Sequence, residues 1–167
     1  MNFLRAWRFI LVMALVAGLS TAAAAQAQKK EKEKDEEGHE QSITRKEMPA
    51  AVLAAFAKAY PKANIIGYSK ETENNQTTYE IESMEGQLHR DVTYMDDGKL
   101  VSVEESIEVA EIPAAVKAAI DKKFPGGKIT RAEKVTKGSA IAYEFEIEFK
   151  GQTVEIVFDA AGKETKI

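Results

Sequence analysis

The sequence predicts an α+β fold: a tandem duplication of an α-β-β-β-β unit, whose antiparallel sheet carries two helices packed on one face. Two observations support this prediction. Shifting the chain by 64 positions aligns residues 42–103 with residues 106–167 without gaps, and 19 of the 62 aligned positions are identical. Each copy also contains one segment with the apolar spacing of a helix, followed by segments in which apolar and polar residues alternate.

Each copy begins with a short amphipathic helix between two prolines, within residues 48–61 and 112–125. Pro49 and Pro113 suit the first helical position, where a missing N–H costs nothing. Pro61 and Pro125 end the helices, because the residue before a proline is pushed out of the α region. The apolar residues recur at spacings of three and four, so we expect one face of each helix to cover the sheet.

Alternating segments predict the strands. In the second copy, large apolar residues over 141–149 alternate with Ala142 and then with glutamates, and a Lys-Gly turn leads to a second alternating segment ending at Phe158. Gly162 turns the chain again into a short last strand, residues 163–167. The first copy matches, with a hairpin turn at Asp96-Asp97-Gly98. A less regular strand, residues 64–72 and 128–136, precedes the first hairpin of each copy and completes the four-stranded unit.

The two units, residues 42–104 and 105–167, are predicted to share one core. A unit of about 60 residues buries only about 60% of its unfolded surface and is marginal alone. Two units can pool their sheets under two helices on one side. That arrangement leaves the opposite sheet face to solvent, as antiparallel sheets allow.

The first 27 residues predict a cleaved signal peptide. Arg5 and Arg8 precede an apolar run at residues 9–19, and Ala25-Gln26-Ala27 fits the small-x-small rule for cleavage after Ala27. The apolar run is too short for a membrane span, which needs roughly 20 residues. We therefore expect a periplasmic or secreted protein that leaves the membrane after cleavage. Residues 28–41 are charged and lack large apolar side chains, which predicts a flexible tether.

The remaining composition limits the partners. From Met48 onward the chain has 15 Lys and Arg against 20 Asp and Glu, and it contains no cysteine. An acidic domain argues against nucleic acid or an anionic membrane as partner, because both require a basic surface. We expect a monomer with a protein partner and no cofactor.

Residues with catalytic potential are few, and the sequence predicts a protein that is not an enzyme. His39 and His89 are the only histidines, and no serine lies in a nucleophile-elbow context. Asp96-Asp97-Gly98 resembles a fragment of a calcium loop but lacks the later ligands. We assign no catalytic residue and no metal site from these patterns.

Acidic residues on the outward side of the predicted strands are the main functional candidate. They are Glu80, Glu82, Asp91, Glu144, Glu146, Glu148 and Glu155. One interpretation is an ordinary solvated sheet face. The other is an acidic surface that docks a basic protein or collects cations. Like charges on adjacent strands are mildly unfavourable, and two of these positions carry Glu in both copies, which favours the functional interpretation.

The repeated pattern x-P-A-A-V…(Y/F)-P…I, followed by Tyr-Glu-x-Glu and a hairpin ending in (D/A)-G-K, resembles the PepSY-like family of exported bacterial proteins, which are related in fold to β-lactamase inhibitory protein. It occurs twice, at Pro49/Pro61/Tyr79/Gly98 and at Pro113/Pro125/Tyr143/Gly162. The resemblance implies two tandem units with a curved sheet and an exported location, and by analogy a binding or inhibitory role. Together with the outward acidic residues, it predicts an exported, non-enzymatic binding module similar to peptidase or enzyme inhibitors, acting through the exposed sheet face. The alternative is a periplasmic cation-binding or envelope-stress protein that uses the same acidic face.

Overall fold

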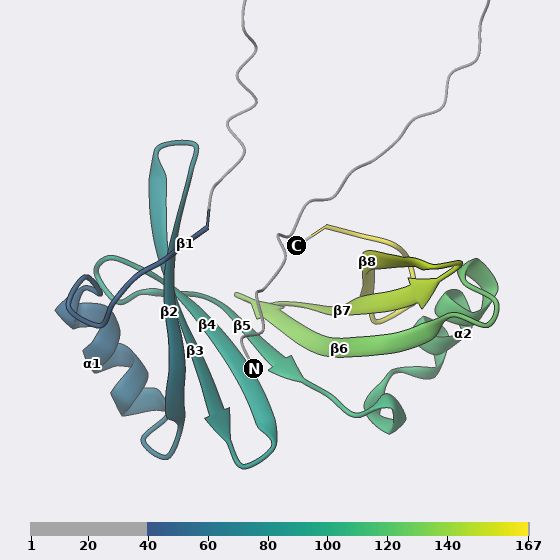
Figure 1. Cartoon of the computed structure of the whole chain (residues 1–167), viewed down its shortest axis with the longest axis horizontal. Coiled ribbons are helices and arrows are strands. Elements are labelled where there is room, and N and C mark those ends of the chain that lie inside the picture. Colours follow the sequence, from purple (N-terminus) through teal and green to yellow (C-terminus); the bar gives the residue numbers. More distant parts are fainter. Residues whose placement is uncertain (1–39, 167) are drawn as a thin grey trace, which may run out of the picture.

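The computed structural model describes residues 40–166, which form one eight-stranded antiparallel sheet and two α-helices (Figure 1). The strands lie side by side in chain order: β1 (Gln41–Ser42), β2 (Asn64–Glu73), β3 (Gln76–Glu85), β4 (Leu88–Met95), β5 (Leu100–Ser106), β6 (Lys128–Lys137), β7 (Ala140–Phe149) and β8 (Gln152–Asp159). The helices are α1 (Ala50–Ala59) and α2 (Ala114–Lys123), and a 3-10 turn, Val109–Glu111, precedes α2. The predicted α+β class is confirmed.

Some predictions fall outside the described residues. These are the signal peptide (1–27), its cleavage after Ala27, and residues 28–39 of the tether. Within residues 40–166, no helix is both long enough and apolar enough to cross a membrane.

The duplication is visible in every element of the first copy up to β4. Helix α2 begins and ends 64 residues after α1, and β6, β7 and β8 follow β2, β3 and β4 at the same offset. Even the irregularities repeat, since β2 has a bulge between Ile65 and Gly67 and β6 has one between Ile129 and Arg131. The two halves therefore have the same local fold.

The prolines frame the helices as predicted, with one shift. Pro49 and Pro113 have extended ψ angles of 137° and 138°, so each is the N-cap and the helix begins one residue later than predicted. Their carbonyl groups still accept the first helical hydrogen bonds. At the other end, Tyr60 and Phe124 leave the helical conformation immediately before the second proline.

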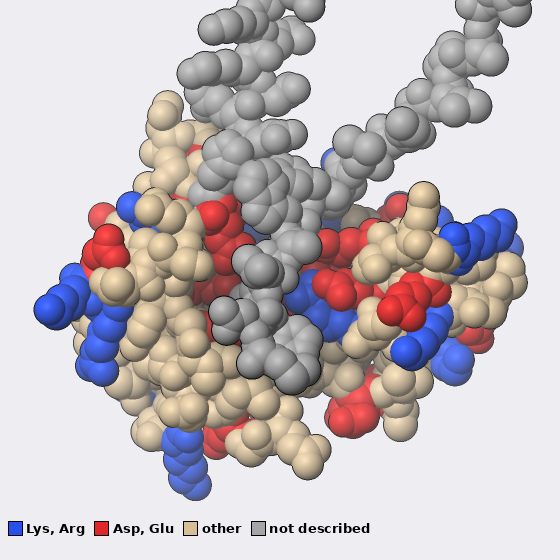
Figure 2. All heavy atoms as spheres, in the orientation of Figure 1, with Lys and Arg blue, Asp and Glu red and all other residues tan. Residues whose placement is uncertain are grey.

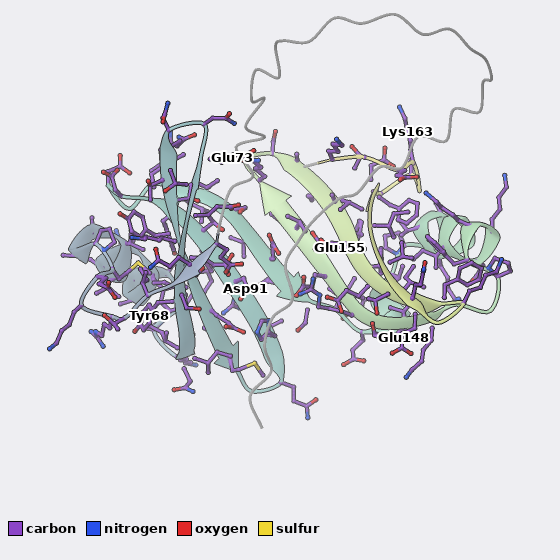
Figure 3. The ribbon with its side chains drawn as sticks, turned by 45° about the horizontal axis from the view of Figure 1, so that its top comes forward. Tyr68, Glu73, Asp91, Glu148, Glu155 and Lys163 are labelled. Carbon is purple, nitrogen blue, oxygen red and sulfur yellow. The ribbon has the colours of Figure 1, made fainter. Side chains whose placement is uncertain are left out.

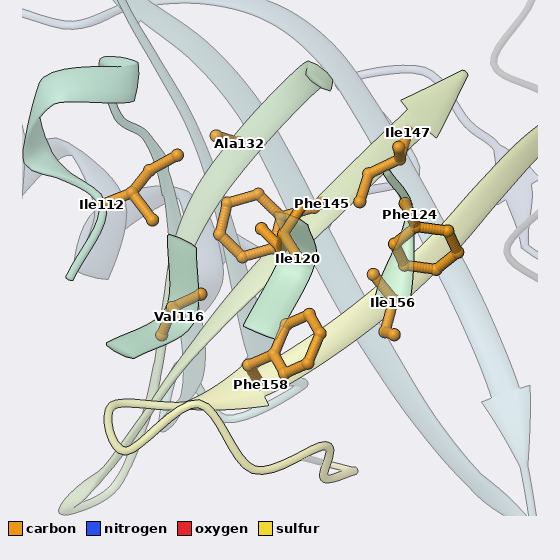
Figure 4. Close-up of a cluster of buried hydrophobic side chains, with 9 residues drawn as sticks. All are labelled: Ile112, Val116, Ile120, Phe124, Ala132, Phe145, Ile147, Ile156 and Phe158. Atoms are coloured by element: carbon orange, nitrogen blue, oxygen red, sulfur yellow. The ribbon is translucent and has the colours of Figure 1, made fainter. Parts of the chain in front are cut away.

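The sheet is continuous, but its hydrophobic core is not. One buried cluster lies under α1 and consists of Met48, Val52, Phe56, Ile81, Val92 and Tyr94. A second lies under α2 (Figure 4) and consists of Ile112, Val116, Ile120, Phe124, Ala132, Phe145, Ile147, Ile156 and Phe158. The expectation of one shared core is therefore wrong. The two helices cover the same sheet face at opposite ends of the molecule (Figure 1), too far apart to enclose one cluster.

Strand β5 belongs to both halves. Its residues Leu100–Glu105 pair with β4 of the first repeat, and its residues Val103–Ser106 pair with β6 of the second repeat. The equivalent strand at the end of the second copy, predicted at 163–167, is reduced among the described residues to a single bridge between Phe158 and Glu164. The two units thus meet at β5 and β6, in the middle of the sheet.

Candidate functional site

Five carboxylates lie across the middle of the sheet, one on each of the strands β3 to β7. Glu82 is directly opposite Asp91, and Asp91 is directly opposite Glu104. On the other side of the β5–β6 junction, Glu133 is directly opposite Glu144. Oxygen atoms of Glu104, Glu133 and Glu144 lie within 4.8 Å of one another, which joins the two groups across the junction. We call these five residues the acidic row.

The acidic row lies on the face opposite the helices. Ile81 and Val92 point into the cluster under α1, and Phe145 points into the cluster under α2. Because successive side chains of a strand point to opposite faces, their neighbours Glu82, Asp91 and Glu144 point away from the helices. Acidic side chains gather around the centre of this face in Figure 2.

Most of the acidic row is buried. The exposed fractions are 1% for Asp91, 8% for Glu104, 2% for Glu133 and 6% for Glu144. The interpretation of these acids as an ordinary solvated sheet face is therefore wrong for Asp91 and Glu144. Both residues lie on interior strands with a paired strand on each side, and neighbouring side chains limit the access of water to them.

The other predicted residues surround this buried centre. Glu80, Glu82, Glu146 and Glu155 are half-buried, and Glu148 is exposed. Figure 3 shows Asp91 and Glu155 on the two halves of the sheet, on either side of the junction. The predicted ladder is thus brought to one face, with a buried middle and a more accessible margin.

Arg131 lies at the second-half end of the acidic row. Its guanidinium nitrogens are 3.3 Å from Glu146 and 3.4 Å from Glu144, and its Nε is 3.6 Å from the Oε2 atom of Glu133. The contact with Glu144 is a long hydrogen bond donated by Nη2. One guanidinium is thus shared among three carboxylates, so its positive charge is divided among them.

His89 lies at the other end. Its Nε2 atom is 2.8 Å from the Oε1 atom of Glu82, and its Nδ1 atom is 3.8 Å from the Oδ2 atom of Asp91. The Ser106 hydroxyl accepts a hydrogen bond from the backbone N–H of His89 at 3.0 Å. Among the described residues, the imidazole therefore lies beside two carboxylates, a set of side chains that can bind a cation.

Glu133 has the most perturbed environment in the acidic row. Burial raises the pKa of its carboxyl group above the ordinary value of 4.5, and the Arg131 guanidinium opposes this shift. Repulsion from the charges of Glu104, Asp91 and Glu144 raises the pKa further. This coupling shows that the charges on both sides of the junction act on one another.

The sequence prediction missed Glu104 and Glu133. Glu133 lies just after the bulge between Ile129 and Arg131, which breaks the alternation that identifies an outward position. Glu104 lies on β5, whose pairing with β6 is a tertiary feature without a local pattern. One sequence signal existed: the duplication places Ser69 at the position of Glu133, so the second copy has gained a carboxylate there.

Comparisons with known proteins agree with the fold. A family model described as "Putative beta-lactamase-inhibitor-like, PepSY-like" matches residues 25–102 and again residues 78–164. No curated protein matches the chain.

Three solved structures from Bacteroides species show the same fold. One from Bacteroides eggerthii, described as "putative periplasmic proteins", has a TM-score of 0.61 at 19% identity and covers 71% of this chain and 86% of its own. A DUF2874 family protein from Bacteroides uniformis has a TM-score of 0.59 at 19% identity, with the same coverage. A BLIP-like protein from Bacteroides fragilis has a TM-score of 0.53 at 16% identity and covers 70% of this chain and 82% of its own. With two matched repeats that together span most of its length, this chain belongs to the beta-lactamase-inhibitor-like, PepSY-like family.

Proposed function

We propose that the chain is an exported, non-enzymatic binding module that captures a basic partner protein on the sheet face opposite its helices. The observation that carries the proposal is the acidic row, with the half-buried acids around it. Like charges on adjacent strands cost stability, and a basic surface bound to the half-buried acids at the margin would offset part of that cost. The inhibitor-like family supports a binding role, and the predicted signal peptide together with the periplasmic description of a similar structure supports export.

The margin of the acidic row is the part that a partner can reach. Glu80 and Glu146 are half-buried on this face, one in each half of the sheet. Complementary charge accelerates association and selects partners by their sign. We therefore expect binding to weaken as salt concentration rises, because screening acts on these accessible charges first.

The test is a pair of charge reversals. The immobilised protein is used to capture envelope proteins, and the affinity of each purified candidate is then measured at low and high salt. Changing Glu80 and Glu146 to Lys should weaken binding by about tenfold or more, roughly 1.4 kcal/mol. The matched control changes Asp96 and Asp121 to Lys. Both are exposed, Asp96 on the hairpin turn and Asp121 on α2. If both double variants bind equally well, the sheet face is not the docking surface.

A second candidate function is cation binding at the same face. Two groups of residues favour it, and within each group the potential ligand atoms lie within 4.8 Å of one another. The first group is Glu82, His89 and Asp91, and the second is Glu104, Glu133 and Glu144. Calcium titration tests this function directly. The absence of both heat and any change in melting temperature would remove it, while protein capture can still be measured in a chelator.

A further inference from the structure

We propose that the junction of the two repeats forms a calcium site, with Glu104, Glu133 and Glu144 as ligands and Asp91 beside them. This inference rests on the second candidate function and gives it a location. The first observation is proximity, since oxygen atoms of the three glutamates lie within 4.8 Å of one another. All three side chains are buried, and each comes from a different strand.

The second observation is an unsatisfied oxygen. The Oε2 atom of Glu133 is buried and accepts no hydrogen bond, although the residue is only 2% exposed. The Nε atom of Arg131, 3.6 Å away, is beyond ordinary hydrogen-bond distance and is likewise without a hydrogen bond. Buried polar atoms are nearly always satisfied in native proteins. A bound cation would satisfy this oxygen.

Charge points to a divalent cation. Four carboxylates lie close enough for their charges to influence one another, those of Asp91, Glu104, Glu133 and Glu144. Arg131 supplies one positive charge to this group. Several ionised carboxylates in a buried cluster repel one another strongly unless a positive charge compensates them. A divalent cation bound between the oxygen atoms attracts each carboxylate and so compensates the repulsion between them.

The chemistry of the donors favours calcium. Every ligand is a carboxylate oxygen, which suits hard cations, whereas zinc in proteins prefers cysteine and histidine ligands. Calcium accepts six to eight oxygens in a flexible arrangement, while magnesium demands a near-ideal octahedron. Carboxylates on separate strands of one sheet can meet the looser requirement more readily.

The first repeat provides an internal control. Residues 64 positions earlier are Glu40, Ser69 and Glu80, and Ser69 is directly opposite Glu80 as Glu133 is opposite Glu144. The fold thus accepts serine at this position. Glu133→Ser should remove a calcium ligand while leaving the sheet intact, and Glu133→Gln should do so at nearly constant volume.

The experiment titrates CaCl2 into the exported protein, stripped with chelator, by calorimetry and by thermal melting. We expect one calcium per chain with a Kd of about 10⁻⁵ to 10⁻³ M. Calcium at about ten times its Kd should raise Tm by roughly 4–7 °C. Glu133→Ser and Glu133→Gln should each weaken binding by about tenfold or more. The control Glu148→Gln, on the same face but 56% exposed, should bind like wild type.

Three results would overturn the inference, and each has a separate meaning. If wild type shows neither heat nor a Tm change, the second candidate function fails with the site. If calcium binds equally to wild type and to both Glu133 variants, cation binding stands and its location is wrong. If His89→Ala weakens calcium binding more than either Glu133 variant does, the group of Glu82, His89 and Asp91 is the cation site instead. Capture of a protein partner, measured in chelator, is independent of all three.

Discussion

A helix packs against a hairpin turn at Gly162, and substituting this glycine tests how the sheet is attached to its helix. Gly162 has a φ of +79°, and a Cβ atom placed there would lie 2.5 Å from the carbonyl oxygen of Ala115 in the first turn of α2. The equivalent Gly98 would place its Cβ 2.8 Å from the carbonyl oxygen of Ala51 in α1. The sequence pattern predicts both glycines as turn residues only. The close approach to the helix is a second requirement.

The cost of Gly162→Ala has two parts, and Gly151→Ala separates them. Gly151 has the same φ of +79°, but a Cβ there meets nothing within 4 Å. The left-handed conformation costs about 1–2 kcal/mol for alanine, and restriction of the unfolded chain returns about 0.4–1 kcal/mol. We therefore expect Gly151→Ala to lower the free energy of unfolding by about 1 kcal/mol. Gly162→Ala adds overpacking against backbone, about 1–3 kcal/mol.

Urea denaturation followed by circular dichroism measures both variants, and Gly98→Ala serves as an independent replicate in the other repeat. The expected order is a small loss for Gly151→Ala and a loss larger by about 1–3 kcal/mol for the other two variants. If the losses for Gly162→Ala and Gly151→Ala differ by less than about 0.5 kcal/mol, the close approach of α2 to the turn does not contribute to stability.

Three further outcomes are expected. Phe145→Ala, in the cluster under α2, should cost about 3–5 kcal/mol in urea denaturation, whereas Ile141→Ala, on the same strand but 46% exposed, should cost less than about 1 kcal/mol. Burial raises the pKa of Glu133, so its ionisation costs stability as pH rises above 4.5. In chelator, Glu133→Gln should therefore have a higher Tm than wild type at pH 7, and the difference in Tm should shrink towards pH 4.5. A difference in Tm that does not change with pH would contradict the raised pKa. Burial also raises the pKa of Tyr94 to about 12. The stability of wild type should thus fall above about pH 10, the usual pKa of tyrosine. Between pH 9 and 11, the Tm of Tyr94→Phe should fall less than the Tm of wild type.

Local patterns predicted the elements closely, because their causes are local. Pro61 and Pro125 end the helices for steric reasons, and β6 was predicted at 128–136 and found at Lys128–Lys137. The two cores were not predictable in this way. Whether two helices enclose one cluster depends on where they lie along the sheet, and the alternation within each strand carries no information about that distance.

The candidate site shows the same division. Alternation correctly placed Glu82 and Glu144 on the face opposite the helices, but it could not show that Glu144 is buried. Burial there depends on the neighbouring strands and on Arg131, which crosses from β6 to reach it. Glu104 entered the site only through the pairing of β5 with β6, which joins residues from different repeats.

The separate cores remove one explanation for the duplication and leave another. Each helix covers its own cluster, so neither repeat gains a larger core from its neighbour. What the pair has and a single repeat lacks is the junction. The acidic row takes Glu82 and Asp91 from the first repeat and Glu133 and Glu144 from the second, and Glu104 lies on the strand that belongs to both. Fusing two copies brings these five carboxylates onto one face, so the duplication creates the candidate site.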